Sequence, residues 1–95
     1  MGRGRAELLK HIAETGSISK AAKAMKMSYK AAWDAVDAMN AAYGRALVES
    51  ATGGSRGGGS EVTADGLKLI RKFEKLQRQH QAWLARSSNQ LQKTK

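Results

Sequence analysis

The sequence predicts a mainly α-helical fold with one small β-hairpin. Two short helical segments are joined by a tight turn and followed by a longer, serine-capped helix over residues 28–43. A glycine-rich stretch then lies between two short apolar segments of strand-like composition, and the last third of the chain repeats apolar residues at helical spacing. Together these features predict a winged helix-turn-helix followed by a long C-terminal dimerisation helix.

The first two predicted helices span residues 5–15 and 18–25. Gly16 is placed to end the first helix in the left-handed conformation, and Ser17 can cap the second. In the turn that follows, Lys26 stands where a glycine is common, and a positive φ there would cost roughly 1 kcal/mol. Apolar residues at helical spacing predict the inner faces, namely Leu8, Leu9, Ile12 and Ala13 in the first helix and Ile18, Ala21, Ala22 and Met25 in the second.

The third predicted helix begins at the capping residue Ser28 and runs to Tyr43. Its predicted inner stripe, built from residues that recur every three or four positions, comprises Ala32, Val36, Met39 and Tyr43. The face left over holds two aromatic rings and three charged groups, from Tyr29, Lys30, Trp33, Asp34 and Asp37. A helix with small residues inside and hydrogen-bonding residues outside suits a groove of DNA, so we interpret it as a recognition helix.

A glycine tract between two short apolar segments predicts the hairpin. Gly44 ends the third helix, residues 47–50 and 61–63 have strand composition, and the glycines lie between them. A flexible linker between domains is the alternative for such a glycine- and serine-rich stretch. We favour a hairpin that forms a wing, because strand-like segments flank the glycines and no second domain is expected to follow.

The last predicted helix follows the capping residue Thr63 and runs from 64 to about 88. Its first turns are expected to pack on the domain, whereas the part beyond Leu76 projects and pairs with a second copy in a homodimer. The apolar seam alternates spacings of four and three and comprises Leu69, Phe73, Leu76, His80 and Trp83, with Leu84 beside it. The chain is thus divided into a winged helix-turn-helix over 1–66, a dimerisation helix over 67–88 and a disordered basic tail over 89–95.

The charge of the chain predicts a polyanionic partner. The formal net charge is +9 over 95 residues, and residues 66–95 hold eight basic side chains against one acidic side chain. Such a balance attracts nucleic acid or an anionic membrane surface. No signal peptide and no apolar run long enough for a membrane span is found in the sequence, so we expect a cytoplasmic protein.

Catalysis and cofactor binding have little support in the sequence. The chain has no cysteine, and its two histidines, His11 and His80, lie far apart without a metal-ligand pattern. The eight acidic residues are scattered along the chain and suggest no catalytic pair. We therefore expect neither an enzyme nor a bound metal or cofactor.

Several motifs resemble a known family. The segments GSISKAA at 16–22, SYKAAWDA at 28–35, LVE and ATGG within 47–54, and VTADG at 62–66 resemble the DNA-binding domain of the ModE family of molybdate-responsive transcriptional regulators. The layout is more distantly similar to the bacterial LysR-type winged helix. The resemblance covers roughly residues 8–76 and implies a DNA-binding regulator of transcription. Nothing here matches the molybdate-binding domains of ModE, so the resemblance does not imply molybdate sensing, and we expect a stand-alone protein rather than a fragment.

The candidate DNA-binding residues divide into those that position the protein and those that read bases. Lys30 can donate to guanine, and Arg56 at the tip of the wing suits a narrow minor groove. Trp33 can contact DNA or pack inside the domain, and a lysine of the second helix can equally lie on a plain solvated face. The full set is Lys20, Lys23, Ser28, Tyr29, Lys30, Trp33, Thr52, Ser55 and Arg56.

The function expected is that of a homodimeric, sequence-specific regulator that binds double-stranded DNA. The recognition helix would enter the major groove, and the wing would lie at the minor groove or the backbone. One alternative is an architectural protein that binds DNA regardless of sequence. Another is a protein-interaction module that forms a heterodimer with a full-length relative or another regulator. The operator sequence, and whether the protein represses or activates, cannot be read from the sequence.

Overall fold

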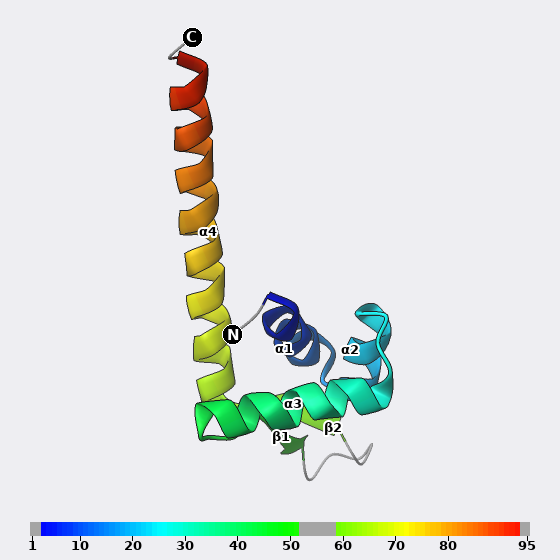
Figure 1. The fold of residues 1–95 in the computed structure, drawn as a ribbon. Helices are drawn as coiled ribbons and strands as arrows, with labels where there is room; N and C mark the ends of the chain where they lie inside the picture. The colour runs from blue at the N-terminus through cyan, green and yellow to red at the C-terminus, as the bar shows by residue number, and fades with distance from the viewer. Residues whose placement is uncertain (1–2, 52–58, 94–95) are drawn as a thin grey trace.

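The computed structural model describes residues 3–51 and 59–93, with the side chains of 4–50 and 59–88. The predicted fold class is confirmed: the described residues form a mainly helical domain with a two-stranded antiparallel hairpin and one long C-terminal helix (Figure 1). The elements in order are α1 (Arg3–Thr15), α2 (Ile18–Ala24), α3 (Tyr29–Tyr43), β1 (Val48–Ala51), β2 (Gly59–Val62) and α4 (Ala64–Lys93).

Local sequence signals explain where the first three helices begin and end. Gly16 and Gly44 end α1 and α3 with φ of 68° and 77°, which a glycine adopts without steric cost. The Ser17 hydroxyl accepts a hydrogen bond from the Lys20 amide at 3.1 Å and so caps α2. Lys26 has a φ of 56°, so the strained turn expected after α2 is present.

The core lies between α1, α2 and α3, closed by the hairpin and the first turns of α4. Leu8, Leu9 and Ile12 of α1 are fully buried with Val36 of α3 and Leu47, which precedes β1. Ile18, Ala21 and Ala22 of α2 belong to this cluster, with Met25 partly buried beside it, and so do Ala32, Val36 and Met39 of α3. A single compact core is expected for a domain of this size.

Two residues predicted to face inward do not. Ala13 is exposed, whereas Ala6, seven residues earlier on the same side of α1, is buried. Helix α4 crosses that side of α1 near Ala6, and Ala6 and Ile70 of α4 line one small pocket there. Ala13 lies two helical turns beyond this crossing, so α4 does not cover it. Tyr43 is 44% exposed because α3 ends there and the chain turns away at Gly44.

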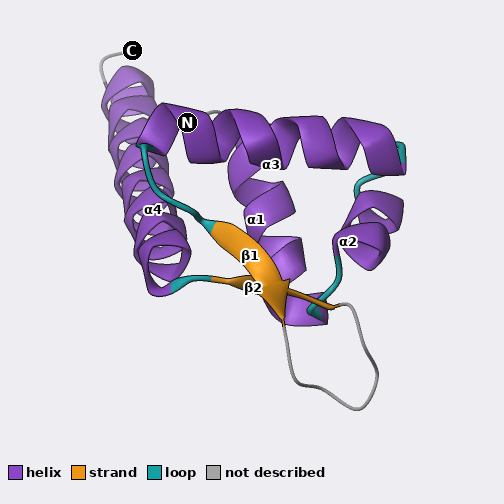
Figure 2. Cartoon of the chain, turned by 90° about the horizontal axis from the view of Figure 1, so that it is seen from below, coloured by secondary structure: helices purple, strands orange, loops and turns teal. Residues whose placement is uncertain are grey.

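The hairpin is anchored to the helical domain at both ends. Its register pairs Val48 with Val62, both buried, and Glu49 with Glu61, both exposed. The Asn40 side-chain oxygen accepts a hydrogen bond from the Leu47 amide at 2.9 Å, which ties α3 to the start of β1. The strands are shifted from the predicted spans 47–50 and 61–63 by one or two residues. The hairpin lies beside α3 on one face of the molecule (Figure 2).

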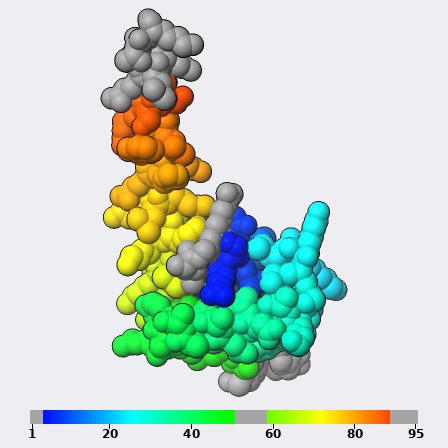
Figure 3. Space-filling model, in the orientation of Figure 1, coloured from blue at the N-terminus to red at the C-terminus, as the bar shows by residue number. Residues whose placement is uncertain are grey.

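Helix α4 packs on the domain near its beginning and then extends away from it. Ile70 is buried, Leu69 and Phe73 are partly buried, and Glu74 pairs with Lys10 of α1 at 3.3 Å. Figure 3 shows the later turns of α4 standing clear of the rest of the molecule on the visible face. This agrees with the expectation that the first turns pack and the later turns project.

The end of α4 differs from the prediction. The helix continues to Lys93 rather than ending near residue 88, so residues 89–93, expected in a disordered tail, are helical. The reason is local: glutamine, leucine and lysine form helices readily, and no glycine or proline interrupts this segment.

Candidate nucleic-acid interface

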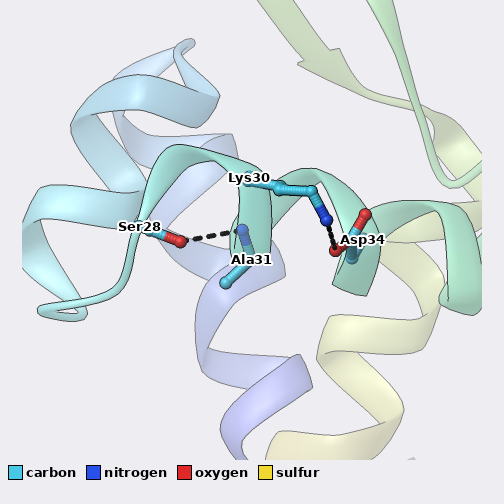
Figure 4. A network of polar contacts seen from close by, with 4 residues as sticks. All are labelled: Ser28, Lys30, Ala31 and Asp34. Atoms are coloured by element: carbon cyan, nitrogen blue, oxygen red, sulfur yellow. Dashed lines mark hydrogen bonds and ion pairs between the residues drawn. The ribbon is translucent and has the colours of Figure 1, made fainter.

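The N-terminal part of α3 presents an exposed polar and aromatic face. Ser28 ends the turn before it, and its hydroxyl accepts a hydrogen bond from the Ala31 amide at 3.0 Å (Figure 4). The Lys30 ammonium lies 3.4 Å from the Asp34 carboxylate one turn further on, and both side chains are mostly exposed, at 87% and 65%. An exposed pair of this kind is weak, so Lys30 can leave Asp34 for a stronger acceptor at little cost.

Trp33 and Tyr29 form an aromatic pair on this face. Their ring centroids are 6.2 Å apart and the planes meet at 79°, an edge-to-face arrangement. Trp33 is partly buried and packs against the core, whereas Tyr29 is 56% exposed. The two uses considered for Trp33 are therefore compatible, because one side of the residue packs inward and the remainder is open to solvent beside Tyr29.

The other predicted contact residues are placed less completely. Lys20 and Lys23 are exposed on α2, the helix that precedes α3 in the helix-turn-helix. Thr52, Ser55 and Arg56 lie outside the described residues. The structure thus groups the candidates of α2 and α3 in one helix-turn-helix, and the contribution of the wing stays a prediction.

The predicted dimerisation residues form a separate surface on α4. All of them except Trp83 line an open groove of about 690 Å³ along the helix, to which Leu69, Phe73, Leu76, His80 and Leu84 contribute the apolar and aromatic side chains. Leu76 and Trp83 are 55% and 56% exposed. The His80 and Trp83 rings lie nearly parallel, at 14°, with centroids 6.3 Å apart. We call the surface of Leu69, Phe73, Leu76, His80, Trp83 and Leu84 the apolar seam.

Two residues that position this site were missed from the sequence. Asn40 links α3 to the hairpin, and Gly66 leaves room for the Leu47 carbonyl and the Val62 side chain beneath α4. Gly66 stands inside the quoted motif at 62–66, and Asn40 lies five residues beyond the motif at 28–35. Their roles depend on contacts with residues distant in the chain, which no local pattern reveals.

Two other kinds of site can be considered among the described residues. Within 3–51 and 59–93, no cluster of three or more histidine, cysteine or acidic side chains is arranged to hold a metal ion. None of the helices in that part of the chain combines the length and apolar character needed to cross a membrane.

Comparison with known proteins decides the family. The model of the bacterial regulatory helix-turn-helix proteins of the lysR family matches residues 4–67. The chain belongs to this family. It therefore contains the DNA-binding helix-turn-helix domain of a transcriptional regulator, as the elements and their order indicated.

The similarity to ModE expected from the motifs is also confirmed. This LysR-family chain is 51% identical over 72 residues to the DNA-binding transcriptional dual regulator ModE of Escherichia coli, covering 76% of the chain and 28% of the relative. It is 41% identical over 87 residues to the molybdenum transport protein ModE of Azotobacter vinelandii, covering 92% of the chain and 32% of the relative. The chain thus spans about a third or less of the length of these relatives.

Solved structures support the fold independently. The crystal structure of the CbnR DNA-binding domain in complex with DNA superposes with a TM-score of 0.71, at 24% identity, over 92% of this chain and 94% of that one. At this identity the match concerns the fold alone. It includes the long helix that follows the hairpin, because nearly the whole of both chains is covered.

Proposed function

We propose that this LysR-family chain is a sequence-specific regulator that binds double-stranded DNA as a homodimer. In this proposal the N-terminal part of α3 enters the major groove, where Lys30 donates to guanine and Ser28 or Tyr29 bonds a phosphate or a base edge. Lys20 and Lys23 of α2 contact the phosphate backbone. Arg56, with Thr52 and Ser55, approaches the minor groove or the backbone from the wing.

The observation that carries the proposal is the contrast between the two faces of α3. Ala32, Val36 and Met39 are buried to within 2% exposure, so the helix is held rigidly on the core. Its opposite face presents Tyr29 and Lys30 to solvent. A rigidly held helix with exposed donors at its N-terminal end meets the geometric requirement for reading base edges.

The homodimer is supported by the apolar seam of α4. Several large apolar side chains lie exposed along one side of a helix that leaves the domain, an arrangement that costs free energy unless another surface covers it. A second copy offers the same stripe in a symmetric pairing. Two recognition helices held by one dimer would then bind two half-sites of a repeated DNA sequence.

A selection experiment tests this function. Purified protein would be incubated with random duplex DNA at near-physiological salt, and the bound fragments would be sequenced. We expect an inverted repeat whose half-sites are separated by about one helical turn or a multiple of it. Tight binding at low salt without a recovered motif would contradict sequence reading and favour an architectural protein, whereas absence of binding would favour a protein-interaction module.

A further inference from the structure

Helix α4 presents a second surface that the proposed function does not use. Its described basic side chains fall within an arc of roughly 120° on a helix of 3.6 residues per turn. All of them are exposed. We call this surface the basic stripe, and it comprises Lys68, Arg71, Lys72, Lys75, Arg78 and Arg86.

No acidic side chain compensates the stripe. The two acidic residues of α4, Asp65 and Glu74, pair with Arg45 at 3.6 Å and with Lys10 at 3.3 Å, both on other parts of the chain. Within the part of the chain that the structure describes, no cation of the stripe forms an ion pair. Several of these cations are three or four residues apart, a spacing at which like charges repel on a helix surface. The stripe therefore concentrates uncompensated positive charge, which attracts a polyanion.

The stripe remains accessible when the other faces of α4 are occupied. The apolar seam covers a separate arc of roughly 100°, and Ile70 and Glu74 turn a third side toward α1. The cations of the stripe occupy the remaining side of α4, between the apolar seam and the side that faces α1. Of the stripe, only Lys72 also lines the groove of the seam, so a partner helix on the seam would leave the other cations of each copy open to solvent.

The stripe also leads away from the proposed recognition surface. Helix α4 begins next to the hairpin at the level of α3 and runs away from the face that α3 and the hairpin form together (Figures 1 and 2). At 1.5 Å per residue, Arg78 and Arg86 lie about 21 Å and 33 Å along the axis from Ala64. A straight duplex bound beneath α3 would not reach these side chains.

We propose that the basic stripe binds the sugar-phosphate backbone of a second DNA duplex, without sequence preference, so that the dimer bridges two DNA segments. The bridging rests on the proposed function of α3, whereas binding by the stripe does not. Duplex DNA is the occupant that the charge favours, because its phosphates form a continuous row that matches a stripe about 27 Å long. An anionic membrane fits less well, since a surface helix inserts its apolar face, and that face is the one paired in the dimer.

A pair of charge-matched variants tests the stripe. Arg78→Gln/Arg86→Gln removes two charges from it, and Ala13→Glu/Ser88→Glu lowers the net charge by the same amount at exposed positions away from it. Duplex DNA on beads would be loaded with protein and washed, and capture of a second, fluorescent duplex would be measured across a salt series. We expect the stripe variant to lose capture of the second duplex. For binding without sequence preference, a plot of the logarithm of the binding constant against the logarithm of the salt concentration should become less steep by about 1.8. The control variant and Arg78→Lys/Arg86→Lys should capture like the unchanged protein.

The outcomes separate this proposal from the function of α3. Capture by the stripe variant at the level of the unchanged protein would overturn the proposal, as would equal loss in the charge-matched control. Binding to phosphatidylglycerol vesicles without capture of a second duplex would assign the stripe to lipid instead. Sequence preference is read separately by the selection experiment, in which the stripe variant should still recover the motif of the unchanged protein. If neither the unchanged protein nor the variants recover a motif, but capture of the second duplex still depends on the stripe, the proposed sequence reading by α3 is wrong and the proposed DNA binding by the stripe is supported.

Discussion

At the scale of single residues, the turn between α2 and α3 contains a strained position. Lys26 is the one residue other than glycine with positive φ among those described, at 56°. Its amide donates a hydrogen bond to the Lys23 carbonyl at 3.1 Å, so the turn is well formed despite the side chain. An L-residue in this region meets a clash between its Cβ and the following carbonyl, which glycine avoids.

Lys26→Gly should therefore raise the free energy of unfolding by about 0.5–1 kcal/mol, after allowance for the greater entropy of the unfolded chain. Urea denaturation followed by circular dichroism at fixed protein concentration measures this. Lys23→Gly is the matched control, and it should lower the free energy of unfolding by about 1 kcal/mol because it places glycine inside α2. A loss of stability in both variants would show that the turn is not strained.

The roles proposed for Lys30 and Lys23 can be separated by substitution. Lys30→Ala should relax base preference and reduce the discrimination between the selected site and a site with one base changed by about 1–3 kcal/mol. Lys23→Ala should instead weaken binding to all sequences similarly and reduce the salt slope by about 1. Competition binding with both duplexes at several salt concentrations distinguishes them. If the two variants behave alike, the assignment of α3 as the recognition helix is wrong.

At the scale of elements, the junction of the hairpin with α4 depends on close backbone packing. The Thr63 hydroxyl donates to the Ala46 carbonyl at 2.8 Å and accepts from the Gly66 amide at 3.2 Å, so it joins the segment before β1 to the first turn of α4. A Cβ on Gly66 would lie 2.5 Å from both the Leu47 carbonyl oxygen and Val62 Cγ1. The wing and the long helix thus share one tightly packed corner.

Gly66→Ala should lower the free energy of unfolding by about 1–3 kcal/mol, because the Leu47 carbonyl belongs to the backbone and cannot move aside cheaply. Thermal unfolding measures the change. Gly4→Ala is the control: a Cβ there meets nothing within 4 Å, and alanine in a helix should stabilise the protein by up to about 1 kcal/mol. A neutral Gly66→Ala would mean that the corner is looser than described.

At the scale of the whole molecule, α4 separates three tasks around one helix. One side packs on α1, a second presents the apolar seam, and a third presents the basic stripe. The longest dimension of the molecule is 62 Å against 25 and 23 Å across, and α4 accounts for most of that length. In the proposed dimer, the later turns of α4 would gain stability from association, because isolated helices are marginal in water.

Leu76→Glu/Leu84→Glu should convert the proposed dimer into a monomer that remains folded, because Leu76 and Leu84 are about half exposed and lie outside the core. Sedimentation equilibrium gives the oligomeric state, and circular dichroism checks the fold. Binding to the inverted repeat should fall at least tenfold, since the second half-site is no longer held nearby. The control variant Leu76→Met/Leu84→Met should remain a dimer. If the glutamate variant also remained a dimer, the apolar seam would not be the dimer interface.

The sequence by itself determined the elements, their order and the family. Serine caps, glycine stops and apolar spacing act within a few residues, so Ser17, Ser28 and Gly44 marked helix ends correctly without knowledge of the fold. The candidate site was predicted as residues of α2, of α3 and of the wing. Those of α2 and α3 are exposed except for the partly buried Trp33, and the wing residues lie outside the described part of the chain.

Only the tertiary structure decided which residues of a predicted face are buried and where a side chain has no room. Ala6 rather than Ala13 is buried, and Gly66 has no room for a side chain, because elements distant in the chain cross at these points. The extension of α4 to Lys93 shows the reverse case, in which local helix propensity continued the element where a tail was expected. Periodicity tells which residues share a face, but the contacts that cover that face come from residues far away in sequence, and only the folded chain brings them together.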